Sequence, residues 1–253
     1  MNLPNPFPGL AVNVAANVQV STPTTASEYK FKKAGKQGTL ITMIIDESGS
    51  MNVARDATIA GFNEFVAGQK ASEATVGAGY LTLIKFDSPH IKTVYSARPL
   101  NEVPTLDRAG YAPNGGTNLL DAIGQAINSV NTVLAEKKKK DRPGVIITIM
   151  TDGEENSSRS FTNQQIKDMV AAAEKADWTF QFLGANIDAF SVGSAFGMSV
   201  ANSVNYSTDS MVGTFASVSA STSRMRMAKS AGISTADIYN NGLYTADELK
   251  KMK

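Results

Sequence analysis

The sequence predicts an α/β fold, a doubly wound and mostly parallel sheet of six strands with helices on both faces and one antiparallel edge strand. The first observation is that residues 40–45 and 144–150 are almost wholly apolar, as is typical of strands buried on both sides. The second is that apolar residues between such runs recur at helical spacing, so strands alternate with helices. The third is a short link between two strands, which predicts the antiparallel edge.

The first strand is followed by a predicted helix and then by a hairpin. Residues 52–70 place Ile59, Phe62, Phe65 and Val66 on one helical face. Residues 80–86 and 91–95 read as strands separated by four residues, which is too few for a crossover helix. We therefore predict that these two strands pair antiparallel. The sole histidine, His90, lies in the turn between them, and we interpret it as a surface residue.

The second half of the chain continues the alternation. A helix is predicted from residue 119, since its apolar residues follow helical spacing, and residues 178–183 form a later strand. Between them, Thr162 and Gln165 form a capping box that starts another helix. We predict that Asp188 caps a short helix that ends near residue 197, that residues 200–206 form an edge strand, and that a long helix spans residues 211–225. The tail contains short helical turns at most.

Composition divides the chain and narrows its function. Residues 1–37 are rich in Pro, Asn and Thr and predict an arm that could support self-association; residues 38–205 form the α/β domain, and residues 206–253 a helix and tail. A net charge of +1 argues against nucleic-acid binding through bulk charge. The chain has no cysteine, no apolar run long enough to cross a membrane and no secretion signal, so we expect a cytoplasmic protein.

Oxygen-bearing side chains follow the two most apolar strands. Asp46, Ser48 and Ser50 come directly after the first strand, and Asp152 ends the other. Thr117 follows two glycines at the start of a helix. In a doubly wound sheet the ligand crevice opens at the carboxyl ends of the central strands, where these side chains would meet. Carboxylate and hydroxyl oxygens suit Mg²⁺ or Mn²⁺, and a divalent cation would offset the repulsion between the carboxylates.

The pattern D-x-S-x-S, then Thr, then a strand ending in T-D-G resembles the metal-ion-dependent adhesion site of the von Willebrand factor A (vWA) family, and in particular its compact bacterial and bacteriophage members. The resemblance implies a Rossmann-like fold with strand order three-two-one-four-five-six. It assigns the metal-site positions to Asp46, Ser48, Ser50, Thr117 and Asp152. It further implies Mg²⁺ or Mn²⁺ as cofactor and a protein partner that offers an Asp or Glu to the metal. An AAA+ ATPase is one partner class that the family suggests, and another virion protein is an alternative.

Other functions fit the sequence less well. A phosphotransferase of the haloacid dehalogenase type needs a second aspartate where Ser48 stands, and a serine hydrolase needs a better-placed histidine than His90. The residues after the first strand also lack the glycine fingerprint of a dinucleotide site. We therefore predict that the chain is not an enzyme. The alternative is a structural or assembly protein, for example in a bacteriophage virion, which would place it in host cytoplasm or a virus particle.

A rim of residues is expected around the ion, where it would tune the choice of partner. The rim residues are Glu47, Met51, Glu154, Glu155 and Asn156. A second interpretation is that they are ordinary solvated loop residues.

Overall fold

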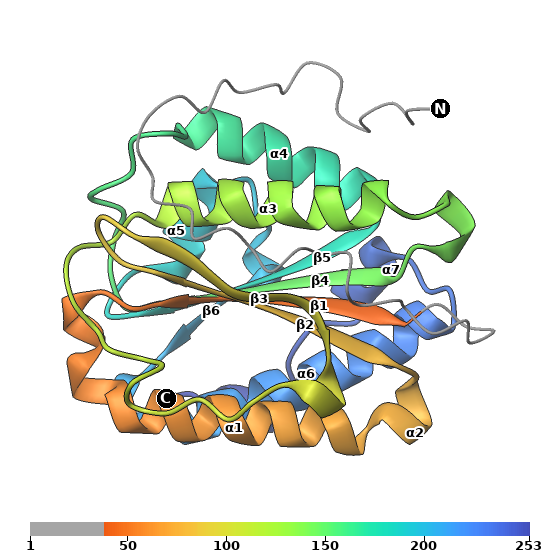
Figure 1. Cartoon of the computed structure of the whole chain (residues 1–253), viewed down its shortest axis with the longest axis horizontal. Coiled ribbons are helices and arrows are strands. Elements are labelled where there is room, and N and C mark those ends of the chain that lie inside the picture. The colour runs from red at the N-terminus through yellow and green to blue at the C-terminus, as the bar shows by residue number, and fades with distance from the viewer. Residues whose placement is uncertain (1–37) are drawn as a thin grey trace.

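A six-stranded sheet forms the centre of the structure, a computed structural model that describes residues 38–253 (Figure 1). The strands, in the order β3-β2-β1-β4-β5-β6 across the sheet, are β3 Ile91–Pro99, β2 Gly79–Phe86, β1 Thr39–Asp46, β4 Gly144–Thr151, β5 Trp178–Ala185 and β6 Ser203–Tyr206. All neighbours pair parallel except β2 and β3. The predicted fold class, the central β1–β4 pair and the antiparallel hairpin are therefore confirmed.

Helices cover both faces of the sheet (Figure 1). On one face lie α3 Leu119–Ala135, α4 Asn163–Lys175 and α5 Ala189–Ala195, and on the other lie α1 Arg55–Ala71 and α6 Met211–Ser230. Three shorter α-helices complete the part of the chain that the structure describes: α2 Glu73–Val76, α7 Thr235–Asn240 and α8 Ala246–Lys251. The capping box of Thr162 and the Asp188 cap of α5 are both present as predicted.

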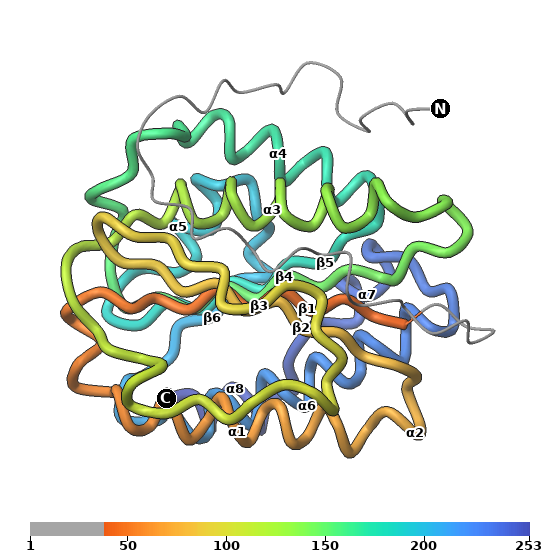
Figure 2. The backbone as a smooth tube through the Cα atoms, viewed as in Figure 1, coloured from red at the N-terminus to blue at the C-terminus, as the bar shows by residue number. Residues whose placement is uncertain are grey.

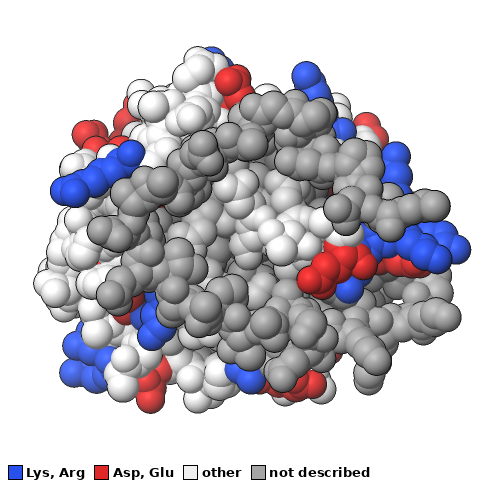
Figure 3. Space-filling view, turned by 45° about the horizontal axis from the view of Figure 1, so that its top comes forward, with Lys and Arg blue, Asp and Glu red and all other residues white. Residues whose placement is uncertain are grey.

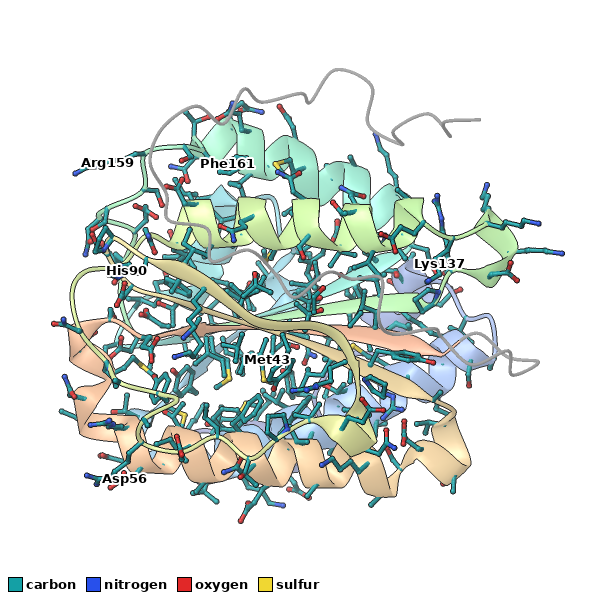
Figure 4. All side chains as sticks on the ribbon, viewed as in Figure 1. Met43, Asp56, His90, Lys137, Arg159 and Phe161 are labelled. Atoms are coloured by element: carbon teal, nitrogen blue, oxygen red, sulfur yellow. The ribbon has the colours of Figure 1, made fainter. Side chains whose placement is uncertain are left out.

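Strand β1 is buried along its whole length because both of its faces are covered. Leu40 and Ile44 belong to the core beneath α3, whereas Met43 and Ile45 belong to the core shared with α1 and α6. Figure 4 labels Met43 in this second layer, between the sheet and α1. This double burial explains why the sequence of β1 has almost no polar face until Asp46.

Several element boundaries differ from the prediction; for example, α6 runs on to Ser230. A 3-10 helix over Gly49–Ala54 precedes α1, so the regular helix begins at Arg55 rather than at residue 52. Strand β3 runs on to Pro99 through a register shift opposite Leu81 and Leu83. Such a bulge interrupts the alternation of apolar and polar residues by which a strand is predicted. Strand β6 is shorter than expected because residues 200–202 form a 3-10 turn.

The last segment of the chain packs on α6, which itself packs on α1 (Figure 2). A Cβ atom on Gly61 of α1 would lie 2.3 Å from the Phe215 ring of α6, so the absence of a side chain at Gly61 permits this close approach. The hydroxyls of Ser217 and Ser221 donate to the carbonyl oxygens of Glu248 and Leu243. Serines are unfavourable inside a long helix, but these two bind the C-terminal tail to α6 through hydrogen bonds.

Residues 1–37, with the predicted arm and its suggested self-association, lie outside the described residues, and the division at residue 205 stays a prediction. Within residues 38–253, none of the helices combines the length and apolar character needed to cross a bilayer. Where described residues are visible in Figure 3, basic and acidic side chains are interspersed.

Candidate metal site

Asp46 ends β1 at the carboxyl edge of the sheet, by which we mean the edge where β1, β2, β4, β5 and β6 end. Its side chain is fully buried. One carboxylate oxygen accepts a hydrogen bond from the backbone amide of Ser48 at 2.7 Å, and the other accepts from the Thr151 hydroxyl of β4 at 2.5 Å. The turn after β1 and the end of β4 are therefore joined through this one carboxylate.

The two serines of the turn extend this connection to Asp152. The hydroxyl oxygens of Ser48 and Ser50 lie 3.1 Å apart, and the Ser50 hydroxyl donates to Asp152 Oδ1 at 2.7 Å. Four of the predicted site residues thus form one continuous hydrogen-bonded chain across the β1–β4 pair.

Thr117 reaches the same place from the Thr117 loop, which we define as residues 103–118 between β3 and α3. Its side chain is buried, and its Oγ1 lies 3.0 Å from the position that a Cβ on Gly153 would occupy. The Thr117 amide donates to Asn156 Oδ1, and the Thr117 carbonyl accepts from the amides of Asn156 and Ser157. Thr117 is therefore held beside the residue that follows Asp152, next to the hydrogen-bonded chain that the other four predicted residues form.

Glycines allow the loops at this edge to touch. Gly115 has a φ of +67°, and a Cβ on it would lie 2.3 Å from the carbonyl oxygen of Ser88 in the β2–β3 turn. Its own carbonyl accepts from the Gly49 amide at 3.0 Å. A Cβ on the neighbouring Gly116 would lie 2.9 Å from Asn156 Oδ1. No other residue type would let these backbones approach as closely.

The electrostatics of the site favour a cation. Burial and, to a smaller extent, the nearby charge of Asp152 together raise the pKa of Asp46 to about 6, although the hydrogen bonds from Thr151 and Ser48 lower it. Burial also raises the pKa of Asp152. No ion pair within residues 38–253 joins either carboxylate to a lysine or arginine. Two carboxylates therefore lie close together without a positive side chain to offset them.

The donor set fits a hard divalent cation. Two carboxylates and three hydroxyls supply only oxygen atoms, which Mg²⁺ and Mn²⁺ prefer. In the described part of the chain, no group of three or more His, Cys, Asp or Glu side chains is suited to a metal. The hydroxyls of Ser48, Ser50 and Thr117 are thus essential to any metal site here, and their role as ligands stays a prediction.

The prediction of rim residues is wrong for Glu47 and Met51, because both side chains are buried rather than exposed around the site. Met51 packs in the core beneath α1, and the Glu47 carboxylate contacts the Lys85 ammonium at 2.6 and 2.7 Å. Glu47 lies between Asp46 and Ser48, and Met51 directly follows Ser50, so their positions in the sequence alone could not reveal that their side chains are buried. Glu154 is exposed at the edge.

Glu155 and Asn156 are not free loop residues, because their side chains accept hydrogen bonds that tie two loops together. The Glu155 carboxylate accepts from the amides of Leu120, Ser157 and Ser158. Asp121, in the first turn of α3, accepts in return from the amides of Arg159, Ser160 and Phe161. The segment after Asp152 and the start of α3 therefore brace each other and hold Thr117 between them.

Sequence reasoning also missed Thr151 and Tyr111. The Tyr111 hydroxyl, fully buried, donates to the backbone carbonyl of Asp46 at 2.6 Å. Thr151 could have been found, since it lies inside the T-D-G motif; Tyr111 lies far from any motif. His90 is exposed and pairs with Asp87, and Figure 4 shows it at the same end of the molecule as Arg159 and opposite Lys137.

Comparisons with known proteins identify the fold. No protein-family model and no curated protein matches the sequence. Among solved structures, the chain is similar to proximal thread matrix protein 1 from the mussel byssus, with 15% identity over 71% of this chain and a TM-score of 0.52. The chain spans 46% of that protein, just under half of its length.

Two further structures are similar at a lower level. A structure of the same mussel protein with a zinc-occupied MIDAS motif matches with 12% identity over 77% of this chain and 46% of that chain, at a TM-score of 0.48. The vWF domain of the type V pili tip protein Mfa5 from Porphyromonas gingivalis matches with 12% identity over 79% of this chain and 97% of that chain, also at 0.48. At such identities the comparisons establish the α/β fold alone.

Proposed function

We propose that this chain is a vWA-type interaction module that holds Mg²⁺ or Mn²⁺ through Asp46, Ser48, Ser50, Thr117 and Asp152 and uses the ion to bind an acidic side chain of a protein partner. The observation that carries the proposal is the hydrogen-bonded chain Asp46–Ser48–Ser50–Asp152 at the carboxyl edge. It joins two carboxylates that no described lysine or arginine neutralises.

The donor set also suggests how a partner would bind. The two carboxylates would balance the charge of a divalent ion, and together with the three neutral hydroxyls they offer five oxygen ligands. A carboxylate from outside would supply the sixth oxygen of an octahedral shell. The metal would supply the electrostatic attraction, and the loops around it the fit.

We infer binding rather than catalysis from the same residues. The hydroxyls of Ser48 and Ser50 are bonded to each other, and that of Ser50 donates to Asp152. The sole histidine, His90, is exposed and bonded to Asp87 rather than to either serine. Neither serine therefore has the basic partner that a nucleophile requires.

Calorimetry tests the metal site. We expect Mn²⁺ and Mg²⁺ to bind the wild-type chain with one-to-one stoichiometry and to give no binding heat with Ser50→Ala or Asp152→Ala. Asp168→Ala, an exposed carboxylate on α4, is the matched control and should bind as the wild type does. Equal titrations for the wild type and Asp152→Ala would remove the proposal.

A structural or assembly role, such as a virion component, is the second candidate, and the sequence observation that favours it is the Pro-rich stretch 1–37. The two candidates differ in how they respond to chelation. A metal-dependent module should lose its partner, whether an AAA+ ATPase or another protein, in EDTA and in Ser50→Ala. An assembly protein should keep its contacts in both conditions.

A further inference from the structure

A buried ion pair begins at the residue next to Asp46 of the candidate metal site. Glu47, the residue after Asp46, and Lys85, near the end of β2, are 9% and 5% exposed, and the Lys85 ammonium contacts both carboxylate oxygens of Glu47. Lys85 also lies 6.0 Å from the centre of the Tyr111 ring. Burial lowers the pKa of Lys85, and the hydrogen bond to Glu47 opposes this shift.

Glu47 holds the Thr117 loop with both its side chain and its backbone. Its carboxylate accepts from the Ala112 amide at 2.6 Å, and its carbonyl accepts from the Asn114 amide at 2.8 Å. On either side, Tyr111 donates to the Asp46 carbonyl, and Gly49 donates to the Gly115 carbonyl. Four hydrogen bonds thus align residues 111–115 with residues 46–49, immediately before Thr117.

Stability alone does not explain an ion pair at this position. A buried ion pair gains little over a well-packed apolar pair, because desolvating two charges offsets their attraction. Lys85 lies beside the Tyr111 ring and on the same face of β2 as Leu81 and Leu83, in a core that would accept apolar side chains. What an apolar pair would lack is an acceptor for the Ala112 amide, and that acceptor fixes where the Thr117 loop lies.

We propose that Glu47 is a positioning residue of the metal site, whose carboxylate, oriented by Lys85, holds residues 111–116 against the turn after β1 and thereby keeps Thr117 beside Asp152. This inference rests on the proposed metal-binding function. It assigns a role to the first variable position of the D-x-S-x-S motif, and it makes Lys85 part of the support of the site although Lys85 touches none of the candidate ligands.

A double variant separates positioning from stability. Glu47→Met with Lys85→Met removes both charges together, so neither is left unpaired, and the variant should fold. We expect its Mn²⁺ affinity to fall about 10-fold, as is typical when support behind a metal ligand is lost. Hydrogen exchange at the Ala112 amide should become faster. Glu47→Gln with Lys85→Met restores an acceptor for Ala112 and should recover most of the affinity.

The control is Glu248→Gln, which breaks the Arg224–Glu248 ion pair in the C-terminal tail while a capping glutamine remains possible. It should change thermal stability without changing Mn²⁺ affinity. If the double Met variant binds Mn²⁺ as tightly as the wild type does, the positioning role is wrong and the metal site stands. If the wild type itself gives no Mn²⁺ binding, both the proposed function and this inference are overturned.

Discussion

At the residue scale, Asp46 shows how the site conflicts with the stability of the fold. Its carboxylate is fully buried, accepts hydrogen bonds from Ser48 and Thr151, and lies near the charge of Asp152. A buried charge without a cation destabilises the native state. The side chain that would bind a metal therefore destabilises the metal-free protein, as is common at functional sites.

We expect Asp46→Asn to stabilise the metal-free protein by up to about 3 kcal/mol at neutral and higher pH. The pKa of Asp46 is raised from 3.8 to about 6, so the protonated carboxyl stabilises the native state at low pH. That contribution is lost as the pH rises through about 6, and the asparagine variant has no such loss. Urea unfolding in EDTA at several pH values measures the difference, which should open between pH 3.8 and about 6. A difference that does not depend on pH would contradict this account.

Gly115 tests the close contact between loops. We expect Gly115→Ala to destabilise the fold by about 2–4 kcal/mol, because it combines left-handed backbone strain with a clash against the Ser88 carbonyl. Gly232→Ala is the matched control: its φ of +76° is similar, yet nothing lies within 4 Å of the added Cβ. It should lose about 1 kcal/mol from strain alone. Thermal unfolding compares the two, and equal losses would show that the contact with Ser88 relaxes freely.

At the element scale, the packing of α1 on α6 depends on a buried arginine. Arg226 of α6 is fully buried and donates to the Gln69 carbonyl in the last turn of α1 and to the Gly77 carbonyl beyond it. Burial lowers the pKa of Arg226 to about 10. The guanidinium bonds carbonyl oxygens at the negative end of the helix dipole and so takes the place of a C-terminal cap.

We expect Arg226→Met to destabilise the protein by about 3 kcal/mol, since the carbonyls of Gln69 and Gly77 and the side-chain oxygen of Gln69 would lose the donor that the buried guanidinium supplies. Arg224→Met, two residues away on the same helix, is the control. Its side chain is 45% exposed and pairs with Glu248, so the loss should be about 1 kcal/mol. Urea unfolding of both variants gives the comparison. Similar losses would mean that the guanidinium of Arg226 can be replaced by simple packing.

The helices and strands could be predicted from the sequence, whereas contacts between residues far apart in the chain could not. Apolar periodicity located β1, β4, α3 and α4 because burial of these segments is continuous and local. The site residues followed, since they lie where those strands end. The Glu47–Lys85 pair joins residues 38 positions apart, and no local pattern indicates such a pairing. Met252 in the tail is fully buried against the core. This long-range contact could not be predicted for the same reason.

At the scale of the whole molecule, the doubly wound order brings the ends of β1 and β4 together, so the segments that follow these two strands meet at one edge of the sheet. The loop before α3 and the segment after β4 are bonded to each other through Glu155, Asn156 and Asp121. The turn after β1 is bonded to both. The conformation of each of these three segments therefore depends on the other two. A cation bound among them would stabilise all three together.

We expect Mn²⁺ to raise the free energy of unfolding of the wild type by about 2.7 kcal/mol at a concentration 100-fold above its dissociation constant, because only the native state assembles the site. The melting temperature should rise with the logarithm of Mn²⁺ concentration. Ser50→Ala should melt at one temperature whatever the Mn²⁺ concentration, and Asp168→Ala should follow the wild type. Calcium chloride at the same ionic strength separates specific binding from salt screening, since Ca²⁺ favours more ligands at longer distances. If the melting temperature of the wild type does not respond to Mn²⁺, the carboxylate and hydroxyl oxygens of the site form hydrogen bonds with one another and do not bind a metal.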